Sequence, residues 1–266
     1  MTEVAADGAL AGRTVLVVGA GTQPSDDPDA PMGNGRAISV AAGQQGATVV
    51  CADRDASAAE ATAELVRAEH GPAHVVVGDV NSPEACEQIV GQTLDLTANG
   101  SLDGLVLNVG IGRGVPTGLA GTSVEDWDVT SAVNLRSHFL VTRAALDHMG
   151  DGSSIVFIGS VAGLRPGSRL PAYDATKAAL VGLARHVALE GAPKGVRANL
   201  IAPGLIDTPL GRLASAGRPS RNRTRVPLGR QGTAWEVASV TTFLLSDAAS
   251  YVTGQVLAVD GGLSLL

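Results

Sequence analysis

A tyrosine and a lysine four residues apart are the strongest sign of chemistry in this chain of 266 residues. Tyr173 and Lys177 stand in "AYDATKAAL", and residues at this spacing lie on the same face of a helix. The chain holds only two Tyr and two Lys, so such a pair is rarely met by chance. A phenol has an ordinary pKa of about 10 and is a poor base at neutral pH, but a neighbouring ammonium favours the phenolate. The pair therefore predicts a proton-transfer site.

A serine stands where it could join this pair. Ser160 follows the apolar run "SIVFI" and precedes Tyr173 by thirteen residues. In a parallel sheet, a residue just after a strand lies at the carboxyl edge, where such folds bind ligands. We expect the hydroxyl, the phenol and the ammonium to converge there. Taken singly, Ser160 could merely cap a turn and Lys177 could be a solvated helix residue.

Three glycines indicate a dinucleotide turn with an unusual spacing. Gly19 ends an apolar run, and Gly33 and Gly35 precede the helix-like stretch "RAISVAAGQQG". Such glycines let backbone amides approach a pyrophosphate at a helix N-terminus. Thirteen residues, many of them Pro, Asp or Ser, separate Gly19 from Gly33. On the glycines alone, a glycine-rich loop without a ligand is about as good an interpretation.

A carboxylate at the end of the second apolar run predicts the cofactor. Asp53 stands eighteen residues after Gly35. A carboxylate there accepts hydrogen bonds from an adenosine ribose and repels a 2′-phosphate, which predicts NAD, with NADP as the weaker alternative. Arg54 could instead serve that phosphate.

The elements that must position these residues follow a repeating pattern. Seven short apolar runs alternate with stretches that are mostly long enough for a crossover helix: residues 14–19, 48–52, 74–78, 104–108, 154–158, 196–201 and 255–259. Near-continuous apolar runs are typical of strands buried on both faces of a parallel sheet. We predict a single-domain α/β Rossmann fold over residues 1–266, with a doubly wound seven-stranded parallel sheet flanked by helices. Residues 1–11 are expected to form a flexible N-terminus.

The composition of the chain excludes some classes of binding partner. The formal net charge of −7 argues against nucleic acid or an anionic membrane as a partner. We find no apolar run of the roughly 18 residues needed to span a bilayer, and no export signal. Two cysteines are too few for a disulfide framework, which favours a reducing, cytoplasmic location. We expect a small-molecule substrate and no metal.

The order of these motifs resembles the short-chain dehydrogenase/reductase (SDR) family from about Gly12 to Gly262. The family's glycine motif matches with ten extra residues, and with Val18 in place of its Thr and Asn34 in place of its usual Ile. "GDVN", "NVG", "SAVNLRSHF", "APGLIDTPL" and "YVTGQVLAVDGG" match the family's other motifs. With Asp53 and Arg54 included, the predicted cofactor-binding residues are Gly19, Gly33, Asn34, Gly35, Asp53, Arg54, Asp79, Val80, Asn108, Val109, Gly110, Tyr173, Lys177, Pro203, Gly204, Ile206 and Thr208.

The resemblance implies a catalytic tetrad of Asn134, Ser160, Tyr173 and Lys177. It implies an NAD-dependent oxidoreductase that interconverts a secondary alcohol and a ketone by hydride transfer, with Tyr173 as acid/base. Ser160 would hydrogen-bond the substrate oxygen, Lys177 would lower the pKa of the phenol and hold the ribose, and Asn134 would support a proton-relaying water. An NADPH-dependent 3-oxoacyl-thioester reductase and a non-catalytic NAD-binding sensor remain as alternatives. The family also implies a homotetramer.

Two irregular stretches stay outside the motifs. Against the family, residues 20–32 contain an insertion, which we interpret as a solvated surface flap; the alternative is a lid over the adenosine half of the site. In the stretch from Leu210 to Arg230, five arginines fall within fourteen residues, at 212, 218, 221, 223 and 225. These could bind an anionic substrate such as a carboxylate or a carrier thioester, but a solvated face is the commoner meaning of such a run. Substrate identity is expected to depend on this stretch and on the loop 164–170.

Overall fold

Seven parallel strands form the central sheet, in the order β3-β2-β1-β4-β5-β6-β9. The structure is a computed structural model that describes residues 8–25, 27, 29–97, 100–165, 167–215 and 225–266. The strands are β1 (Thr14–Val18), β2 (Thr48–Asp53), β3 (Ala73–Val77), β4 (Gly104–Leu107), β5 (Ser154–Ile158), β6 (Arg197–Pro203) and β9 (Val256–Val259). Each falls on one of the seven predicted runs, so the predicted Rossmann sheet is confirmed.

The strand order reverses between β1 and β4. From β1 the chain adds β2 and β3 on one side, and then β4, β5, β6 and β9 on the other. All neighbouring strands of this sheet pair in parallel. In open α/β sheets, ligands bind outside the carboxyl ends of the strands at such a reversal. The fold therefore places its binding crevice next to the ends of β1 and β4.

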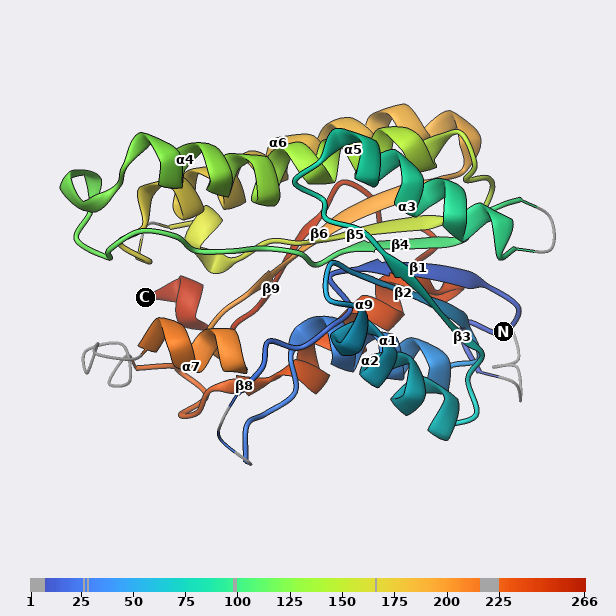
Figure 1. The fold of residues 1–266 in the computed structure, drawn as a ribbon, viewed down its shortest axis with the longest axis horizontal. Helices are drawn as coiled ribbons and strands as arrows, with labels where there is room; N and C mark the ends of the chain where they lie inside the picture. Colours follow the sequence, from blue (N-terminus) through green and yellow to red (C-terminus); the bar gives the residue numbers. More distant parts are fainter. Residues whose placement is uncertain (1–7, 26, 28, 98–99, 166, 216–224) are drawn as a thin grey trace.

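Helices cover both faces of the sheet (Figure 1). One layer holds α3 (Pro83–Asp95), α4 (Val124–Ser131), α5 (Ser137–Leu146) and α6 (Pro171–Gly191). The other layer holds α1 (Asn34–Gln44), α2 (Ala56–Ala68) and α9 (Ala234–Leu245). A short helix, α7 (Pro209–Ser215), lies beyond the sheet near the two-residue strands β7 (Ile206–Asp207) and β8 (Gly232–Thr233), which pair with each other. Single helical turns are η1 (Leu119–Gly121), η2 (Ala132–Arg136), η3 (Val161–Gly163), η4 (Ala192–Lys194), η5 (Asp247–Ala249) and η6 (Leu263–Leu265).

The core consists of two aliphatic clusters, one on each face of the sheet. Along β1, Leu16 and Val18 belong to the cluster beneath α3, α5 and α6, whereas Val15 and Val17 belong to the cluster with α1, α2 and α9. Because both faces are covered, both sets of side chains must be apolar. Cys51 and Cys86 are buried as free thiols in these clusters, and burial raises the pKa of each to about 11. Both therefore act as small core residues.

The described part of the N-terminal stretch packs onto α1. Leu10 is fully buried, and its backbone N–H donates to the Gln45 carbonyl at 2.9 Å. Of the segment 1–11 that we expected to be flexible, residues 8–11 are thus docked; residues 1–7 lie outside the described part. Among the described helices, none is long and apolar enough to cross a membrane.

Candidate cofactor and catalytic site

The glycine turn is folded as one unit in spite of its long spacing. Gly19 has a φ of +82°, a left-handed conformation that favours glycine. A Cβ on Gly35 would overlap the Gly19 carbonyl oxygen, and that oxygen accepts a hydrogen bond from Asn108 Nδ2 at 2.7 Å. Gly33 donates its N–H to the Thr22 hydroxyl at 3.1 Å. The end of β1 and the start of α1 therefore meet through backbone, with no room for side chains.

The N-terminus of α1 has the properties of an anion site. Its N-cap, Gly33, offers no side-chain acceptor to the first N–H groups, whereas Asp55 and Ser82 cap α2 and α3. Such N–H groups and the helix dipole favour a negative group. The close backbone approach at Gly19 and Gly35 also leaves room for a pyrophosphate. These residues fit a dinucleotide.

Asp53 lies at the end of β2, beside the turn. Its Oδ2 accepts a hydrogen bond from Gly21 N–H at 2.9 Å, and its Oδ1 accepts one from Asp55 N–H at 3.1 Å. Each carboxylate oxygen has a second lone pair, so the group can still accept ribose hydroxyls. Arg54 is exposed next to it. Asp79 is exposed at the end of β3 and accepts a hydrogen bond from Asn81 N–H, while Val80 is buried.

Asn34, where the related motif has Ile, carries an orphaned polar atom. Its Oδ1 is buried and has no hydrogen-bond partner among the described residues. A buried acceptor without a partner costs roughly 1–3 kcal/mol of stability. Asn34 in place of Ile therefore destabilises the turn locally. The close contact between Gly19 and Gly35 is kept all the same.

The predicted nicotinamide-side residues gather between the end of β6 and α7. Pro203 ends β6, and a Cβ on Gly204 would lie 2.6 Å from the Asp260 Cβ, so this turn is closely packed. Ile206 is buried in β7. The Thr208 hydroxyl accepts a hydrogen bond from Gly211 N–H at 3.0 Å and so helps to start α7.

Lys177 lies at the centre of the candidate catalytic site. Its side chain is 4% exposed, and its Nζ donates to the Ile158 carbonyl at 2.9 Å. Nζ lies 5.8 Å from the centroid of the Tyr173 ring, as the shared helix face predicts. Burial lowers the pKa of Lys177 to about 8. The ammonium is therefore still mostly charged at neutral pH and becomes easier to neutralise above it.

Ser160 and Tyr173 flank this lysine. Ser160 comes two residues after Ile158, the acceptor of the lysine, and its hydroxyl accepts a hydrogen bond from Ala162 N–H at 3.1 Å. Next to Tyr173 runs the segment after β4: a Cβ on Gly112 would lie 3.9 Å from Tyr173 Cδ2, and one on Gly110 would lie 3.2 Å from Lys177 Nζ.

Asn134 reaches the same segment from the opposite helix. It lies fully buried in η2, a π-helical turn of the kind often found at functional sites. Its Oδ1 accepts a hydrogen bond from Ile111 N–H, and its Nδ2 donates to the Ile111 carbonyl, both at 2.8 Å. Its Nδ2 also donates to the Thr176 hydroxyl at 3.3 Å. Asn134 thus fixes the segment after β4, beside Lys177.

Two residues of this network escaped the sequence analysis. Thr176 bridges Asn134 and α6, because its hydroxyl also donates to the Tyr173 carbonyl at 2.9 Å. Ile111 takes part through its backbone alone. A polar residue directly before Lys177 on a buried helix face is a signal that could have revealed Thr176. A backbone contact leaves no mark on residue type, so Ile111 could not have been found.

The 20–32 segment contacts α7. Arg212 Nη1 lies 2.6 Å from Asp27 Oδ2, and the same guanidinium contacts Asp207 through Nε at 2.8 Å and Nη2 at 3.0 Å. Of the five arginines considered for an anionic substrate, Arg212 is therefore paired with carboxylates within the chain. Arg218, Arg221 and Arg223 lie outside the described residues, and Arg225 is exposed.

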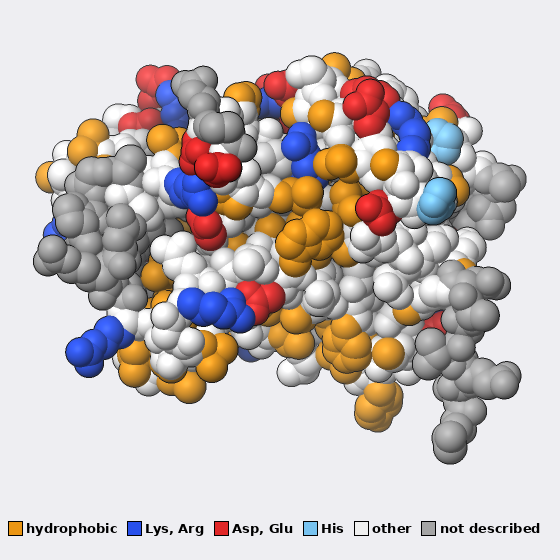
Figure 2. All heavy atoms as spheres, turned by 90° about the horizontal axis from the view of Figure 1, so that it is seen from below, with side chains coloured by type: hydrophobic (Ala, Val, Ile, Leu, Met, Phe, Trp, Pro, Cys, Tyr) orange, Lys and Arg blue, Asp and Glu red, His pale blue; other side chains and the backbone are white. Residues whose placement is uncertain are grey.

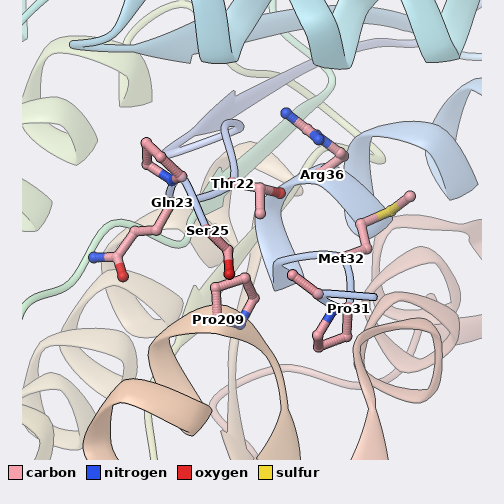
Figure 3. Close-up of a pocket in the computed structure, with 9 residues that line it drawn as sticks. Thr22, Gln23, Ser25, Pro31, Met32, Arg36 and Pro209 are labelled. Atoms are coloured by element: carbon pink, nitrogen blue, oxygen red, sulfur yellow. The ribbon is translucent and has the colours of Figure 1, made fainter. Parts of the chain in front are cut away.

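A cavity of about 340 Å³ lies between the 20–32 segment and α7 (Figure 3). Its lining includes Thr22, Ser25 and Pro31 of the segment, Arg36 of α1 and Pro209 of α7. Arg36 Nε donates to the Thr62 hydroxyl at 3.0 Å. Most of the lining residues belong to the segment itself, and α7 contributes Pro209 to the wall of the cavity.

The described surface around this region is mixed in charge. On the face in Figure 2, basic side chains lie singly among acidic and apolar ones. Within the described residues, no group of three or more His, Cys, Asp or Glu could hold a metal ion.

Known proteins match this chain over nearly its full length. A family model described as "Enoyl-(Acyl carrier protein) reductase" matches residues 30–264. The 3-oxoacyl-[acyl-carrier-protein] reductase FabG of Thermotoga maritima is 33% identical over 256 residues, which is 96% of this chain and 98% of that protein. A solved SDR from Brucella melitensis, titled glucose/ribitol dehydrogenase, is 32% identical with a TM-score of 0.82, covering 97% of this chain and 98% of its own.

A further solved relative bears on the cofactor. A protein from Agrobacterium tumefaciens, crystallised with bound NADP, is 34% identical with a TM-score of 0.84, covering 98% of this chain and 100% of its own. This similarity supports NAD(P) as the cofactor class. It does not support the predicted preference for NAD over NADP, which stays a prediction that depends on Asp53.

Proposed function

The chain belongs to the short-chain dehydrogenase/reductase family and is an NAD(P)-dependent oxidoreductase acting on CH–OH groups, and from this premise we propose that it interconverts a secondary alcohol and a ketone with Tyr173 as acid/base. The observation that carries the proposal is the buried Lys177 beside the Tyr173 ring. The bound nicotinamide dinucleotide supplies or accepts the hydride.

Each residue of the tetrad has a role that its surroundings support. Tyr173 exchanges a proton with the substrate oxygen, and the Lys177 ammonium favours the phenolate form of Tyr173 by its charge. Ser160 donates its hydroxyl to the substrate oxygen, because its hydroxyl hydrogen is not required by the bond it accepts from Ala162 N–H. Asn134 holds the Ile111 backbone in place and so supports the wall of the site beside Lys177.

We also propose how the cofactor is held. Gly19, Gly33, Asn34 and Gly35 would face the pyrophosphate, with residues 20–32 as an insertion within that turn. The adenosine half would be held by Asp53, Arg54, Asp79 and Val80. The nicotinamide half would be held by Asn108, Val109, Gly110, Tyr173, Lys177, Pro203, Gly204, Ile206 and Thr208.

Asp53 leads us to propose NAD as the preferred cofactor. A carboxylate held by two backbone amides cannot turn away from a 2′-phosphate without losing both hydrogen bonds. We expect NAD⁺ to bind at least about tenfold more tightly than NADP⁺, which corresponds to about 1.4 kcal/mol. Titration of both cofactors followed by intrinsic fluorescence tests this. Equal affinities, or tighter NADP⁺, would remove the assignment and favour Arg54 as the reader of the phosphate.

A second candidate is reduction of a 3-oxoacyl thioester, because FabG of Thermotoga maritima is among the relatives. Activity of the protein on a panel of secondary alcohols, ketones and an acetoacetyl thioester would separate the two reactions. Turnover confined to the thioester, with NADPH, would favour the second candidate. A sensor without catalysis is disfavoured because all four tetrad residues are present and three of them are linked directly or through Thr176.

We propose a homotetrameric, cytoplasmic protein on the strength of the family resemblance. Val124, Trp127 and Phe139, from α4 and α5, are large apolar side chains that remain exposed in the single chain. Burial of such side chains between subunits would stabilise an assembly. Sedimentation at micromolar concentration should give the mass of four chains. A monomer at that concentration would contradict the proposal.

A further inference from the structure

One arginine joins two segments of the chain that lie on either side of the proposed cofactor site. Arg212 belongs to α7, and Asp27 belongs to the 20–32 segment, 185 positions away. Their side chains meet with Nη1 and Oδ2 2.6 Å apart. Arg212 Nη1 also approaches the Asp29 carbonyl oxygen at 3.5 Å.

The geometry of Arg212 makes it a fixed link. Nε and Nη2 form a two-pronged contact with both oxygens of Asp207, at 2.8 and 3.0 Å. Bidentate contacts of this kind fix the orientation of a guanidinium plane. The remaining nitrogen, Nη1, is thereby aimed at Asp27. Asp207 directly precedes Thr208, and the Thr208 hydroxyl accepts a hydrogen bond from Gly211 N–H in the first turn of α7. The contact of Arg212 with Asp207 therefore lies next to the start of that helix.

Among the described residues, the hydrogen bonds between these two segments are those of Arg212 with Asp27 and with the Asp29 carbonyl oxygen. Between them lies the cavity of about 340 Å³, with Pro31 on one side and Pro209 on the other (Figure 3). The ion pair of Arg212 with Asp27 is therefore a polar link across the edge of this cavity. The segment is exposed at residues 23–25, 27 and 29 and is linked to α7 through Asp27, so the flap and the lid over the adenosine half both stay predictions.

We propose that Asp27 and Arg212 are positioning residues that tie the phosphate turn to α7 and so slow the release of the dinucleotide. The inference rests on the proposed function. Residues 20–32 connect Gly19 to Gly33 in the turn proposed for the pyrophosphate, and α7 follows Thr208 in the segment proposed for the nicotinamide half. A dinucleotide held between these parts leaves more slowly when the parts cannot separate.

The test measures the rate at which NADH and NADPH leave the full-length protein. Release is followed by stopped-flow fluorescence of the reduced cofactor, with an excess of the non-fluorescent oxidised cofactor as competitor. Asp27→Asn removes the charge of the link and keeps the bidentate contact between Arg212 and Asp207. Asp29→Asn is the matched control, since it removes the same charge from the same segment, and the Asp29 side chain forms no ion pair among the described residues. Exposed ion pairs have modest strength, so we expect release from Asp27→Asn to be about two- to fivefold faster.

Two further readouts separate a positioning role from a general effect of charge. The difference between wild type and Asp27→Asn should shrink at about 1 M salt, where the screening length is about 3 Å. Arg212→Gln should speed release in the wild type more than in the Asp27→Asn background, because part of its effect is already lost there. Hydrogen exchange without cofactor should quicken in residues 206–215 of Asp27→Asn and not of Asp29→Asn.

The outcomes decide between the claims. Equal release rates in wild type and Asp27→Asn, or equal acceleration by Asp29→Asn and Asp27→Asn, would overturn the positioning role while leaving the oxidoreductase function intact. Failure of the wild type to bind either dinucleotide would refute the proposed function and the retention role together. Hydrogen exchange would then still report whether Asp27 ties the two segments.

Discussion

At the scale of single residues, the candidate site depends on one buried cation. Lys177 has lost nearly all contact with water, and its ammonium donates a hydrogen bond to the Ile158 carbonyl. Burial lowers its pKa to about 8, so the ammonium beside the Tyr173 ring is itself close to titrating. The pKa of His138 is lowered to about 3, mainly because the ring is buried and secondly because of the positive charge of Lys177. The charge of Lys177 thus bears on the ionisation of a second buried group.

Tyr173→Phe removes only the phenolic oxygen and keeps the ring on α6. If Tyr173 is the acid/base, kcat should fall by about 10²–10⁴-fold, the loss typical of removing such a group. NAD⁺ binding should persist, because the ring and the lysine remain. The measurement is steady-state kinetics with a turnover substrate together with a fluorescence titration of the cofactor. A variant with near-normal kcat would show that another group is the acid.

Lys177→Met serves as the contrasting variant. Because the ammonium is proposed both to tune the phenol and to hold the ribose, kcat and cofactor affinity should fall together. In the wild type, cofactor affinity should decline as pH rises through about 8, where the ammonium of the empty protein loses its proton. That decline should be absent in the variant. A Lys177→Met protein with unchanged affinity would confine the lysine to the proton-transfer step.

At the scale of elements, much of the fold could be predicted because the strands are apolar on both faces. Each of the seven predicted runs overlaps a strand of the sheet. The bounds of run and strand differ by at most two residues at either end. The paired strands β7 and β8 escaped, because two residues each are too few to show a periodicity. The contact of Asp27 with Arg212 also escaped, since it joins exposed residues far apart in sequence. The proximity of Tyr173 and Lys177 was predictable because the two residues are four apart on one helix, whereas Asn134 was placed only through the resemblance to the family.

At the start of α1, the cost of an unsatisfied buried oxygen can be measured. Asn34 buries an oxygen that has no partner among the described residues. We expect Asn34→Ile to raise the free energy of unfolding by about 1 kcal/mol, since an apolar side chain there leaves no buried acceptor unsatisfied. Urea unfolding followed by circular dichroism measures this, with Asn81→Ile, a change on the exposed loop after β3, as the control. A loss of stability in Asn34→Ile would show that the amide makes a contact the single chain does not reveal.

At the scale of the whole molecule, a buried histidine links stability to pH. His138 is fully buried and lies 6.3 Å from the Phe157 ring, centroid to centroid. The Ser137 hydroxyl donates to the Val133 carbonyl at 2.6 Å, so the 3.1 Å contact between His138 Nδ1 and that hydroxyl needs the proton on Nδ1. Nε2 is then an acceptor without a partner among the described residues. A second proton would place a charge in the core, away from water.

The sign of the effect follows from the two pKa values. Burial lowers the pKa of His138 from 6.5 to about 3, so the unfolded chain binds this proton more readily than the native one. The free energy of unfolding is unaffected by this group above pH 6.5 and falls as pH drops from 6.5 towards 3, by about 1.4 kcal/mol per pH unit. Between pH 6.5 and pH 5 the loss is about 2 kcal/mol.

His138→Leu should remove that part of the acid sensitivity. The variant can lose stability at every pH through altered packing against Phe157, so the quantity to compare is the difference in unfolding free energy between pH 7 and pH 5. We expect this difference to shrink by about 2 kcal/mol relative to wild type. His148→Leu, at an exposed position, should leave it nearly unchanged. If both variants keep the wild-type difference, then His138 takes up its proton in the native protein, and the acid sensitivity of the molecule resides in its other groups.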